Sequence, residues 1–553
     1  MTELLTAAQM RAIEQAAIAS GEVTGLELME RAGRGVVEAI FEEWPELKAG
    51  SFRAVVLCGP GNNGGDGFVV ARLLKDWGWE VEVFLYGDPE KLPADARVSY
   101  ERWRERGEVR SLSEFDAGSV SPLGTGDPVG CWIIDALFGT GLTRPLEGDA
   151  AKAASALSAL GLGARPAVVA VDIPSGVCAD SGRFLGAAMP AEQTVTFHLP
   201  KLGHYLSDGG QGVSTIALKS IGLKARPAHP IRSTVLIPGT PNIYGAMLAK
   251  EWDARGQIAR HKYSHGHALI LSGPPGHTGA ARLAARGALR IGAGLVTIAA
   301  EPEAIAEHAA QLNAIMLREV GDGDGLRTIL SDKRINALCL GPGLGLDGRA
   351  AGLVAAALGW HLPEGLPLIE ATDAQVSAWF RKHGHRPACV LDADALTLLS
   401  RDPALFGMLH DGCVLTPHAG EFARLFPDIA EKLAAPATKG PAYSKVDATR
   451  EAAKRAGCVV LYKGPDTVIA DPEGRCVINS AHYDRAAPWL ATAGSGDVLA
   501  GFIAGLLARG FGPMQAAETA AWLHVECALT FGPGLIAEDL PEQLPAVFRK
   551  LGV

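Results

Sequence analysis

The sequence lacks paired cysteines, long apolar runs and an excess of positive charge. Its nine cysteines are scattered, odd in number and never spaced as CxxC, which predicts reduced thiols that mostly fill the core. No apolar run reaches the roughly 18 residues that a membrane span needs. The N-terminus has no basic segment followed by an apolar core, so no signal peptide is expected. These absences predict a cytoplasmic protein with no membrane association.

The charge balance excludes a further class of partner. Lysine and arginine together number 51 against 61 aspartate and glutamate residues, which gives a formal net charge of −10 over 553 residues. Such a chain has no excess of positive charge that would attract a polyanion, so nucleic acid is not an expected partner. Hydrophobic residues make up 48% and charged residues 20%, as in ordinary globular proteins, and the length suggests more than one core.

Short β-rich runs alternate with helical stretches in two separate series. The first starts near residue 52 with RAVVLCG, and the second starts at HALILSG (267–273) and ends in a helical region from Asp497 to about Arg509. This alternation predicts two α/β domains with parallel, helix-flanked sheets. A proline-containing stretch at 219–250 lies between the two series. We place the boundary near 225–240, which gives domains of 1–225 and 235–553.

A glycine-rich loop follows the first strand of the first series, in VVLCGPGNNGGDG. Glycines let backbone N–H groups approach an anion, and a helix that opens near Asp66 would add the positive end of its dipole. Such a loop alone can equally be a tight turn. Asn62, Asn63 and Asp66 strengthen the ligand-site interpretation, because open α/β sheets bind ligands at the carboxyl ends of their strands.

Two further strand ends carry hydrogen-bond acceptors. Asp135 follows an apolar run in IIDALFGTGLTRP, and Asp172 and Ser175 follow another in VVAVDIPSG. Any one of them could simply cap a turn or the next helix. Because three strand ends carry the same signature, we expect their loops to form one binding site.

The motifs GPGNNGGDG, DALFGTGL, DIPSG and TFHLPKLGH resemble, in this order, the epimerase domain of the bifunctional NAD(P)H-hydrate repair enzymes over about residues 1–220. The resemblance implies a Rossmann-like domain that interconverts the R and S forms of hydrated NADH and NADPH. It also implies a potassium ion bound by Asn63, Asp135 and Ser175. Substrate contacts are implied for Asn62, Asn63, Gly64, Gly65, Asp66, Gly139, Thr140, Gly141, Leu142, Thr143, Arg144, Pro145 and Asp172.

The implied epimerisation needs proton transfer rather than redox chemistry. Asp172 and Lys201 are the acid/base candidates in this part of the chain. Lys201 follows a β-rich run, and it could instead be a solvated surface lysine.

The most informative motif of the second series is APWLATAGSGDVLAGFIAGLLARGFG. Its GSGD segment precedes an apolar helix, and Gly510 suits the position just after the helix end. Free N–H groups of Gly494 to Gly496 would form a nest for a transferring phosphoryl group. Asp497, in the first turn, could take a proton from an attacking substrate hydroxyl. Alternatively, Asp497 only complements the helix dipole.

Together with GPGLG (341–345), LDADAL (391–396), TPHAGEFARLF (416–426) and YKGPDTVIAD (462–471), this segment resembles the ribokinase-like dehydratase of the same repair enzymes over about 235–553. The resemblance implies that this domain dehydrates the S hydrate to NAD(P)H with ADP, giving AMP and phosphate. It also implies magnesium, whose ligands the sequence does not identify. The implied roles are catalysis and substrate contact by Asp497, substrate contact by Gly343 and His418, and adenine-nucleotide binding by Lys463, Gly464, Pro465, Asp466, Thr467 and Gly496.

Two other functions compete with this interpretation. A ribokinase-like small-molecule kinase fused to a nucleotide-binding module would share the GSGD helix start, but the NxxE segment that such kinases often carry is missing after residue 235. A non-catalytic binding module is disfavoured by the intact NNGGDG, Asp135 and Asp172. His261, His265 and His267 resemble no four-ligand zinc site, so we expect a polar loop that leads into a strand. The expected partners are small-molecule substrates and further copies of the chain in a homo-oligomer.

Overall fold

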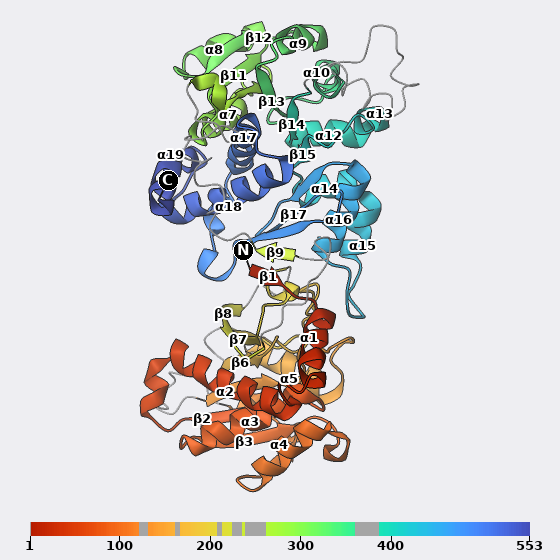
Figure 1. The fold of residues 1–553 in the computed structure, drawn as a ribbon, viewed down its shortest axis with the longest axis vertical. Helices are drawn as coiled ribbons and strands as arrows, with labels where there is room; N and C mark the ends of the chain where they lie inside the picture. The colour runs from red at the N-terminus through yellow and green to blue at the C-terminus, as the bar shows by residue number, and fades with distance from the viewer. Residues whose placement is uncertain are drawn as a thin grey trace.

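The computed structural model describes residues 2–120, 131–160, 166–206, 213–223, 235–237, 261–359 and 386–552. Figure 1 shows two groups of elements along the long axis of the molecule, red to orange from the first series and green to blue from the second. The boundary predicted near 225–240 lies outside the described residues, apart from a short strand at 235–237.

The first sheet is parallel throughout its described strands, as predicted. Helices cover both of its faces, and the central strands are therefore buried on both sides. The strands lie in the spatial order β4 (Val109–Ser111), β3 (Glu80–Leu85), β2 (Arg53–Cys58), β5 (Cys131–Ala136), β6 (Ala167–Val171), β7 (Ala191–Phe197) and β8 (Val213–Lys219). The helices are α1 (Ala7–Ala19), α2 (Gly25–Glu43), α3 (Asn62–Asp76), α4 (Ala94–Arg104) and α5 (Gly148–Ala159).

The second sheet is mixed, because β17 (Asp466–Ala470) and β18 (Cys476–Ser480), which the sequence pattern did not reveal, pair antiparallel beyond β16 (Val459–Tyr462). Its strands lie in the spatial order β1 (Thr2–Leu4), β9 (Val235–Ile237), β18 (Cys476–Ser480), β17 (Asp466–Ala470), β16 (Val459–Tyr462), β15 (Cys413–Leu415), β14 (Ala388–Leu391), β13 (Ile335–Leu340), β10 (His267–Leu271), β11 (Leu295–Ala300) and β12 (Met316–Glu319).

Two hydrophobic clusters cover the two faces of the second sheet, so both domains have the predicted three-layer α/β/α architecture. One face packs against α7 (Gly279–Arg290), α17 (Ser495–Ala508), α18 (Pro513–Phe531) and α19 (Asp539–Leu551). The other packs against α9 (Gly323–Leu330), α10 (Gly348–Leu358), α12 (Ala393–Arg401), α13 (Pro403–Phe406), α14 (Ala419–Leu425), α15 (Pro427–Ala434) and α16 (Lys445–Ala456). The short α8 (Ile305–Ala309) precedes β12.

Local chemistry explains where several helices begin. Thr24 caps α2 with Glu27 in a capping box, and Ser444 caps α16 with Asp447 in the same way. The helix α17 begins after Gly494, whose φ of 87° is a left-handed conformation that glycine adopts at no steric cost. Because α17 is buried on nearly all sides, its sequence is apolar throughout rather than amphipathic.

The N-terminal strand β1 joins the second sheet rather than the first. Thr2–Leu4 pair antiparallel with Val235–Ile237, and Leu4 packs into the second domain's core. Figure 1 accordingly places the N-terminus beside β9, between the two groups of elements. Further links are a hydrogen bond from the Gly440 amide to the Thr143 carbonyl (2.9 Å) and one from the Tyr483 hydroxyl to the His204 carbonyl (2.6 Å). The two domains are therefore in direct contact.

Three composition-based expectations can be compared with the structure. All nine cysteines are free and buried, as predicted. A short 3-10 turn, Lys262–His265, leads into β10, so the histidine-rich segment is the expected loop before a strand. Among the described residues, no helix combines the length and the apolar character required to cross a bilayer.

Candidate active sites

The first site lies where the strand order of the first sheet reverses, between β2 and β5. Because β2, β5 and β6 are neighbours and parallel, the loops after them meet at one edge, as predicted. The helix α3 begins at Asn62, however, not near Asp66 as expected. The glycines there allow close packing: a Cβ on Gly64 would lie 2.0 Å from the Gly59 carbonyl oxygen. The Asn-Gly segment is therefore a helix start instead of a free loop.

A cavity of about 460 Å³ occupies this edge. Eight of the predicted substrate contacts line it: Asn62, Asn63, Asp66, Gly139, Thr140, Gly141, Leu142 and Asp172. Five others do not line it, namely Gly64, Gly65, Thr143, Arg144 and Pro145. Gly64 and Gly65 are buried within α3, where they serve packing. The lining also includes Arg11 and Glu14 of α1, which no motif had indicated because they precede the first predicted strand.

Asp172 and Lys201 form a buried ion pair at this cavity. The Lys201 Nζ atom lies 2.8 Å from Asp172 Oδ1, and Lys201 is fully buried, which excludes the surface-lysine alternative. Burial would raise the pKa of Asp172, but the charge and hydrogen bond of Lys201 and the Thr196 hydroxyl hold it below its ordinary value. Asp172 also has a φ of 68°, a left-handed conformation that costs energy for a residue other than glycine and is found most often at functional sites.

Two further carboxyl groups of the cavity are shifted the other way. Burial, followed by the charges of Asp172 and Glu14, raises the pKa of Asp66 well above its ordinary value. Burial and the charge of Asp172 raise the pKa of Glu14 to about 7, against smaller opposing effects of Lys201 and Arg11. The cavity therefore contains carboxyl groups in different protonation states at neutral pH.

The three residues predicted to bind potassium lie at the same edge of the sheet: Asp135 is near the end of β5, Ser175 follows β6, and Asn63 is in the first turn of α3. The Ser175 amide and hydroxyl donate to the Asp135 carboxylate at 2.7 and 2.6 Å. Asn63 lines the neighbouring cavity, and a Cβ on Gly139 would lie 2.8 Å from its Oδ1 atom. Burial raises the pKa of Asp135 to about 6, and no ion pair to a lysine or arginine compensates its charge within the described part of the chain. A monovalent cation bound to these oxygen atoms would supply the missing positive charge.

The second site is built around the start of α17. Two cavities, of about 490 and 600 Å³, meet there and share the lining residues Lys463, Gly464, Ser495 and Gly496. Asp497 is the third residue of α17, and Gly510 follows its C-terminal end with a φ of 90°, as predicted. Burial and the charge of Asp392 raise the pKa of Asp497 to about 6, while Lys463 opposes the shift.

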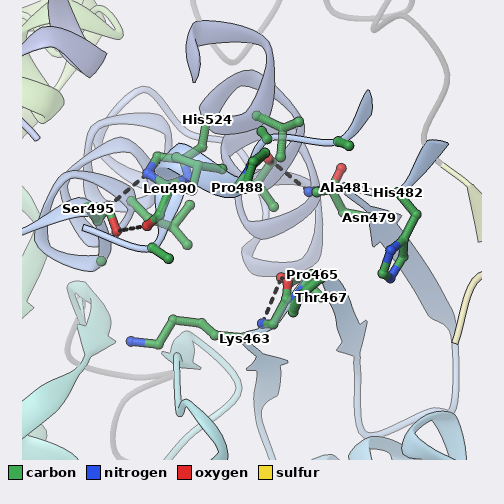
Figure 2. Close-up of a pocket in the computed structure, with 18 residues that line it drawn as sticks. Lys463, Pro465, Thr467, Asn479, Ala481, His482, Pro488, Leu490, Ser495 and His524 are labelled. Atoms are coloured by element: carbon green, nitrogen blue, oxygen red, sulfur yellow. Dashed lines mark hydrogen bonds between the residues drawn. The ribbon is translucent and has the colours of Figure 1, made fainter. Parts of the chain in front are cut away.

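The smaller cavity is largely apolar (Figure 2). Lys463, Pro465 and Thr467 line one side of it, while Ser495 and His524 line another, and the His524 Nε2 atom lies 2.9 Å from the Ser495 carbonyl oxygen. In Figure 2 the amino group of Lys463 extends away from Asn479 and His482. It ends 2.7 Å from Asp392 Oδ1, a lining residue of the larger cavity. Lys463 therefore reaches both cavities.

The larger cavity gathers the polar groups, including Asp392, His418, Lys463 and Asp497. His418 caps α14: its Nδ1 accepts from the Gly420 amide at 3.0 Å, while Glu421 accepts from the His418 amide at 2.8 Å. The His418 ring remains half-exposed toward the cavity. Two carboxyl groups, an ammonium group and a partly exposed histidine thus share one space beside the helix start.

Two residues predicted to contact the substrate or the nucleotide, Gly343 and Asp466, do not line either cavity. Asp466 does not line either cavity, because its carboxylate is buried in an ion pair with Lys445 at 2.7 Å. Gly343 follows β13 at the switch point of the second sheet and packs against His277. The residues that sequence reasoning missed are Asn479, His482 and His524, which lie on unpredicted β18, after it and on α18. Asp392 was visible as part of LDADAL but had been given no role.

The fold and the two sites define a two-domain α/β enzyme acting on small molecules. Two family models match: YjeF-related protein N-terminus over residues 25–203, and NAD(P)H-hydrate dehydratase over residues 268–544. The chain is 35% identical over 571 residues to the bifunctional NAD(P)H-hydrate repair enzyme Nnr of Moorella thermoacetica, covering 99% of this chain and 97% of the relative. The chain therefore belongs to the family of bifunctional NAD(P)H-hydrate repair enzymes, which join an epimerase to a dehydratase.

Other relatives match one domain each. The NAD(P)H-hydrate epimerase of Rhodobacter capsulatus is 46% identical over 228 residues, covering 40% of this chain and all of the relative. A solved structure of an ADP/ATP-dependent NAD(P)H-hydrate dehydratase from Bacillus subtilis, co-crystallized with ATP and Mg²⁺, covers 57% of this chain and 99% of its own, at 25% identity and a TM-score of 0.42. The family assignment disfavours the kinase alternative.

Proposed function

We propose that the cavity of the first domain binds the hydrated nicotinamide nucleotide for epimerisation, and that the joined cavities of the second domain bind ADP and the S hydrate. The meeting of the two cavities at Lys463 and Gly496 is the observation that carries the proposal. An apolar space suits an adenine, and a polar space with a base suits a reacting hydroxyl. Lys463 can then hold the phosphate between them.

In the proposed dehydration, Asp497 takes the proton of the ring hydroxyl as its oxygen attacks the terminal phosphorus of ADP. The bond from that phosphorus to the bridging oxygen breaks, and AMP leaves. The amides at the start of α17 hold the transferring group. Phosphate then leaves from the ring carbon with the electrons of the C–O bond, and loss of a ring proton restores the dihydropyridine. ADP is thereby consumed because hydroxide is a poor leaving group and phosphate is a better one.

Metal ions have separate roles in the two domains. In the second domain, Asp392 supplies a carboxylate to the larger cavity, and it would hold magnesium beside the phosphates. Magnesium would neutralise developing phosphate charge. In the first domain, Asn63, Asp135 and Ser175 would hold potassium, which would balance the buried carboxylate. The roles of Gly343 and Asp466 stay predictions, since neither residue lines the two cavities at the start of α17.

We infer the cellular compartment of the enzyme from the state of its cysteines. Nine free, buried cysteines are typical of a reducing compartment, which supports the cytoplasm. A homo-oligomer stays a prediction, to be measured by sedimentation.

The full-length protein can be tested with hydrated NADH, with and without ADP. With ADP, the pure S hydrate should regain the absorbance of NADH, and the pure R hydrate should do so only through epimerisation. Without ADP, the two hydrates should interconvert with no gain in absorbance. Transfer of phosphate to a stable product, with no NADH formed, would instead support the kinase alternative.

A further inference from the structure

Glu14 is an ionisable group in the first cavity that the motifs assign no part in epimerisation. It lies on α1, which precedes the first predicted strand, and it lines the same cavity as Asp66 and Asp172. A second independent sign that the cavity accepts a ligand is the Nδ2 atom of Asn63, which is buried without a hydrogen-bond partner. Epimerisation requires proton transfer on two faces of the ring, so one ionised carboxylate alone is not sufficient.

Lys201 is not placed to provide the second proton-transfer group. Its Nζ atom donates to Asp172 Oδ1 at 2.8 Å, to Thr196 Oγ1 at 2.9 Å and to the Phe197 carbonyl at 3.2 Å. These three acceptors match the three donors of an ammonium group. Lys201 is also absent from the lining of the cavity. Its geometry is that of a residue that orients and ionises Asp172.

His204 is engaged in the same way. The Lys201 amide donates to its Nδ1 at 3.0 Å, so the proton of the neutral ring is on Nε2, which lies 2.9 Å from the Asp172 carbonyl oxygen. Burial and the charge of Lys201 lower the pKa of His204 to about 4. Both ring nitrogens are therefore occupied, and His204 has no proton to exchange with a substrate.

Glu14 differs from these residues because nothing in the described chain holds its carboxyl group. It has neither a hydrogen bond nor an ion pair among the described residues, and only burial and more distant charges act on it. The charged and titratable groups around the same cavity are Arg11 on α1, Asp66 on α3, Asp95 on α4 and Asp172 after β6, with Lys201 behind Asp172. With a pKa of about 7, Glu14 is available both as an acid and as a base at neutral pH.

We propose that Glu14 is the second catalytic residue of the epimerase, acting with Asp172, and that Lys201 is a positioning residue for Asp172. In one direction, the Glu14 carboxyl gives its proton to the ring hydroxyl. The C–O bond then breaks with its electron pair, water leaves, and the ring nitrogen lone pair forms an iminium bond. Water adds to the other face and the Asp172 carboxylate takes its proton. Exchange with solvent returns both carboxyl groups to their starting states.

This inference rests on the epimerase activity of the first domain, and the test uses the full-length protein. Epimerisation of the R hydrate is followed by chromatography without ADP. Glu14→Gln keeps the size of the side chain and removes its titration, so it should lower kcat by about 10²–10⁴-fold. Dehydration of the S hydrate with ADP should not change, which would show that the loss is confined to the first domain. The matched control is Glu38→Gln, an exposed carboxylate on α2, which should epimerise at the wild-type rate.

The pH profile separates chemistry from structure. Wild-type epimerisation in this direction should fall as pH rises through about 7, because Glu14 loses the proton that it donates. Glu14→Gln should lose that step, whereas Glu14→Asp should keep a step at a shifted pH with a lower kcat. A wild-type kcat and profile in Glu14→Gln would overturn the proposal, as would an unshifted profile in Glu14→Asp if Glu14→Gln does not fold. A wild-type enzyme that fails to interconvert the hydrates would overturn the epimerase assignment itself.

Discussion

Each domain contains a buried lysine–aspartate pair at its site, and the two pairs have different surroundings. The Nζ to Oδ1 distance is 2.8 Å between Lys201 and Asp172 and 2.7 Å between Lys463 and Asp392. The side chain of Lys201 is 1% exposed and has three oxygen acceptors, whereas that of Lys463 is 19% exposed and lines two cavities.

The comparison shows that the same type of ion pair can serve different roles in the two domains. A lysine whose donors are all occupied in the protein interior fixes the charge state of its partner. A lysine that borders open space keeps donors for a phosphate. The role of each residue is therefore decided by its access to the cavity, and the following predictions test that difference.

The largest effect is expected for Asp497→Asn in the second domain. The amide is nearly isosteric and still suits the start of α17, so general-base loss should slow dehydration by about 10²–10⁴-fold. Wild-type dehydration should also decline as pH falls through about 6, where Asp497 becomes protonated and can no longer accept a proton. The measurement is NADH formation from the S hydrate. If the variant dehydrates the S hydrate at the wild-type rate and loses only about 0.3–1 kcal/mol of stability, Asp497 is not the base and only complements the helix dipole.

Replacing each lysine with methionine should separate the two pairs. Lys201→Met removes a fully enclosed ammonium group, whose place beside Asp172 solvent cannot take, so it should lower the free energy of unfolding by about 3–5 kcal/mol and abolish epimerisation. Lys463→Met removes an ammonium group that is 19% exposed, so water can take its place beside Asp392 and the loss should be about 1–2 kcal/mol, with a higher KM for ADP. Urea unfolding and initial rates give both quantities. Equal losses of stability would contradict the difference in access.

Asp135 offers a test of potassium binding that does not depend on activity. Its pKa in the folded protein, about 6, lies above the ordinary 3.8. The folded state therefore binds the proton more tightly, and without potassium the stability contribution is lost as pH rises from about 4 to 6, by up to about 3 kcal/mol. Potassium should abolish that loss in the wild type but not affect Asp135→Asn. Unfolding in potassium or a bulky organic cation, at both ends of this range, measures the difference.

The smallest effect is expected at the contact between the domains. Tyr483→Phe removes the hydrogen bond that the Tyr483 hydroxyl donates to the His204 carbonyl. The His204 ring in turn contacts the backbone of Asp172, which is paired with Lys201. A loss of about 0.5–1.5 kcal/mol in positioning corresponds to a roughly two- to tenfold slower epimerisation. Dehydration should not change. An unaltered epimerisation rate would mean that the first site is independent of the second domain.

Sequence patterns predicted the elements that have a simple period. The runs that became β2, β5, β6 and β10 were identified, because buried parallel strands are continuous apolar segments. The start of α3 was predicted four residues late, since its glycines are selected by packing against Gly59 rather than by loop geometry. The ion pair between Asp466 and Lys445 was not indicated by any sequence pattern, and the contact of Asp466 with the nucleotide stays a prediction.

The sequence by itself determined the two α/β domains, the glycine-rich helix starts and the carboxylates that end the strands. Each of these depends on residues that are close together in the chain. Only the tertiary structure decided that Glu14 shares a cavity with Asp172, that Lys201 is enclosed while Lys463 is not, and that β1 pairs in the second sheet. The physical reason is that burial and electrostatic coupling depend on distance in space, and residues far apart in the sequence set both.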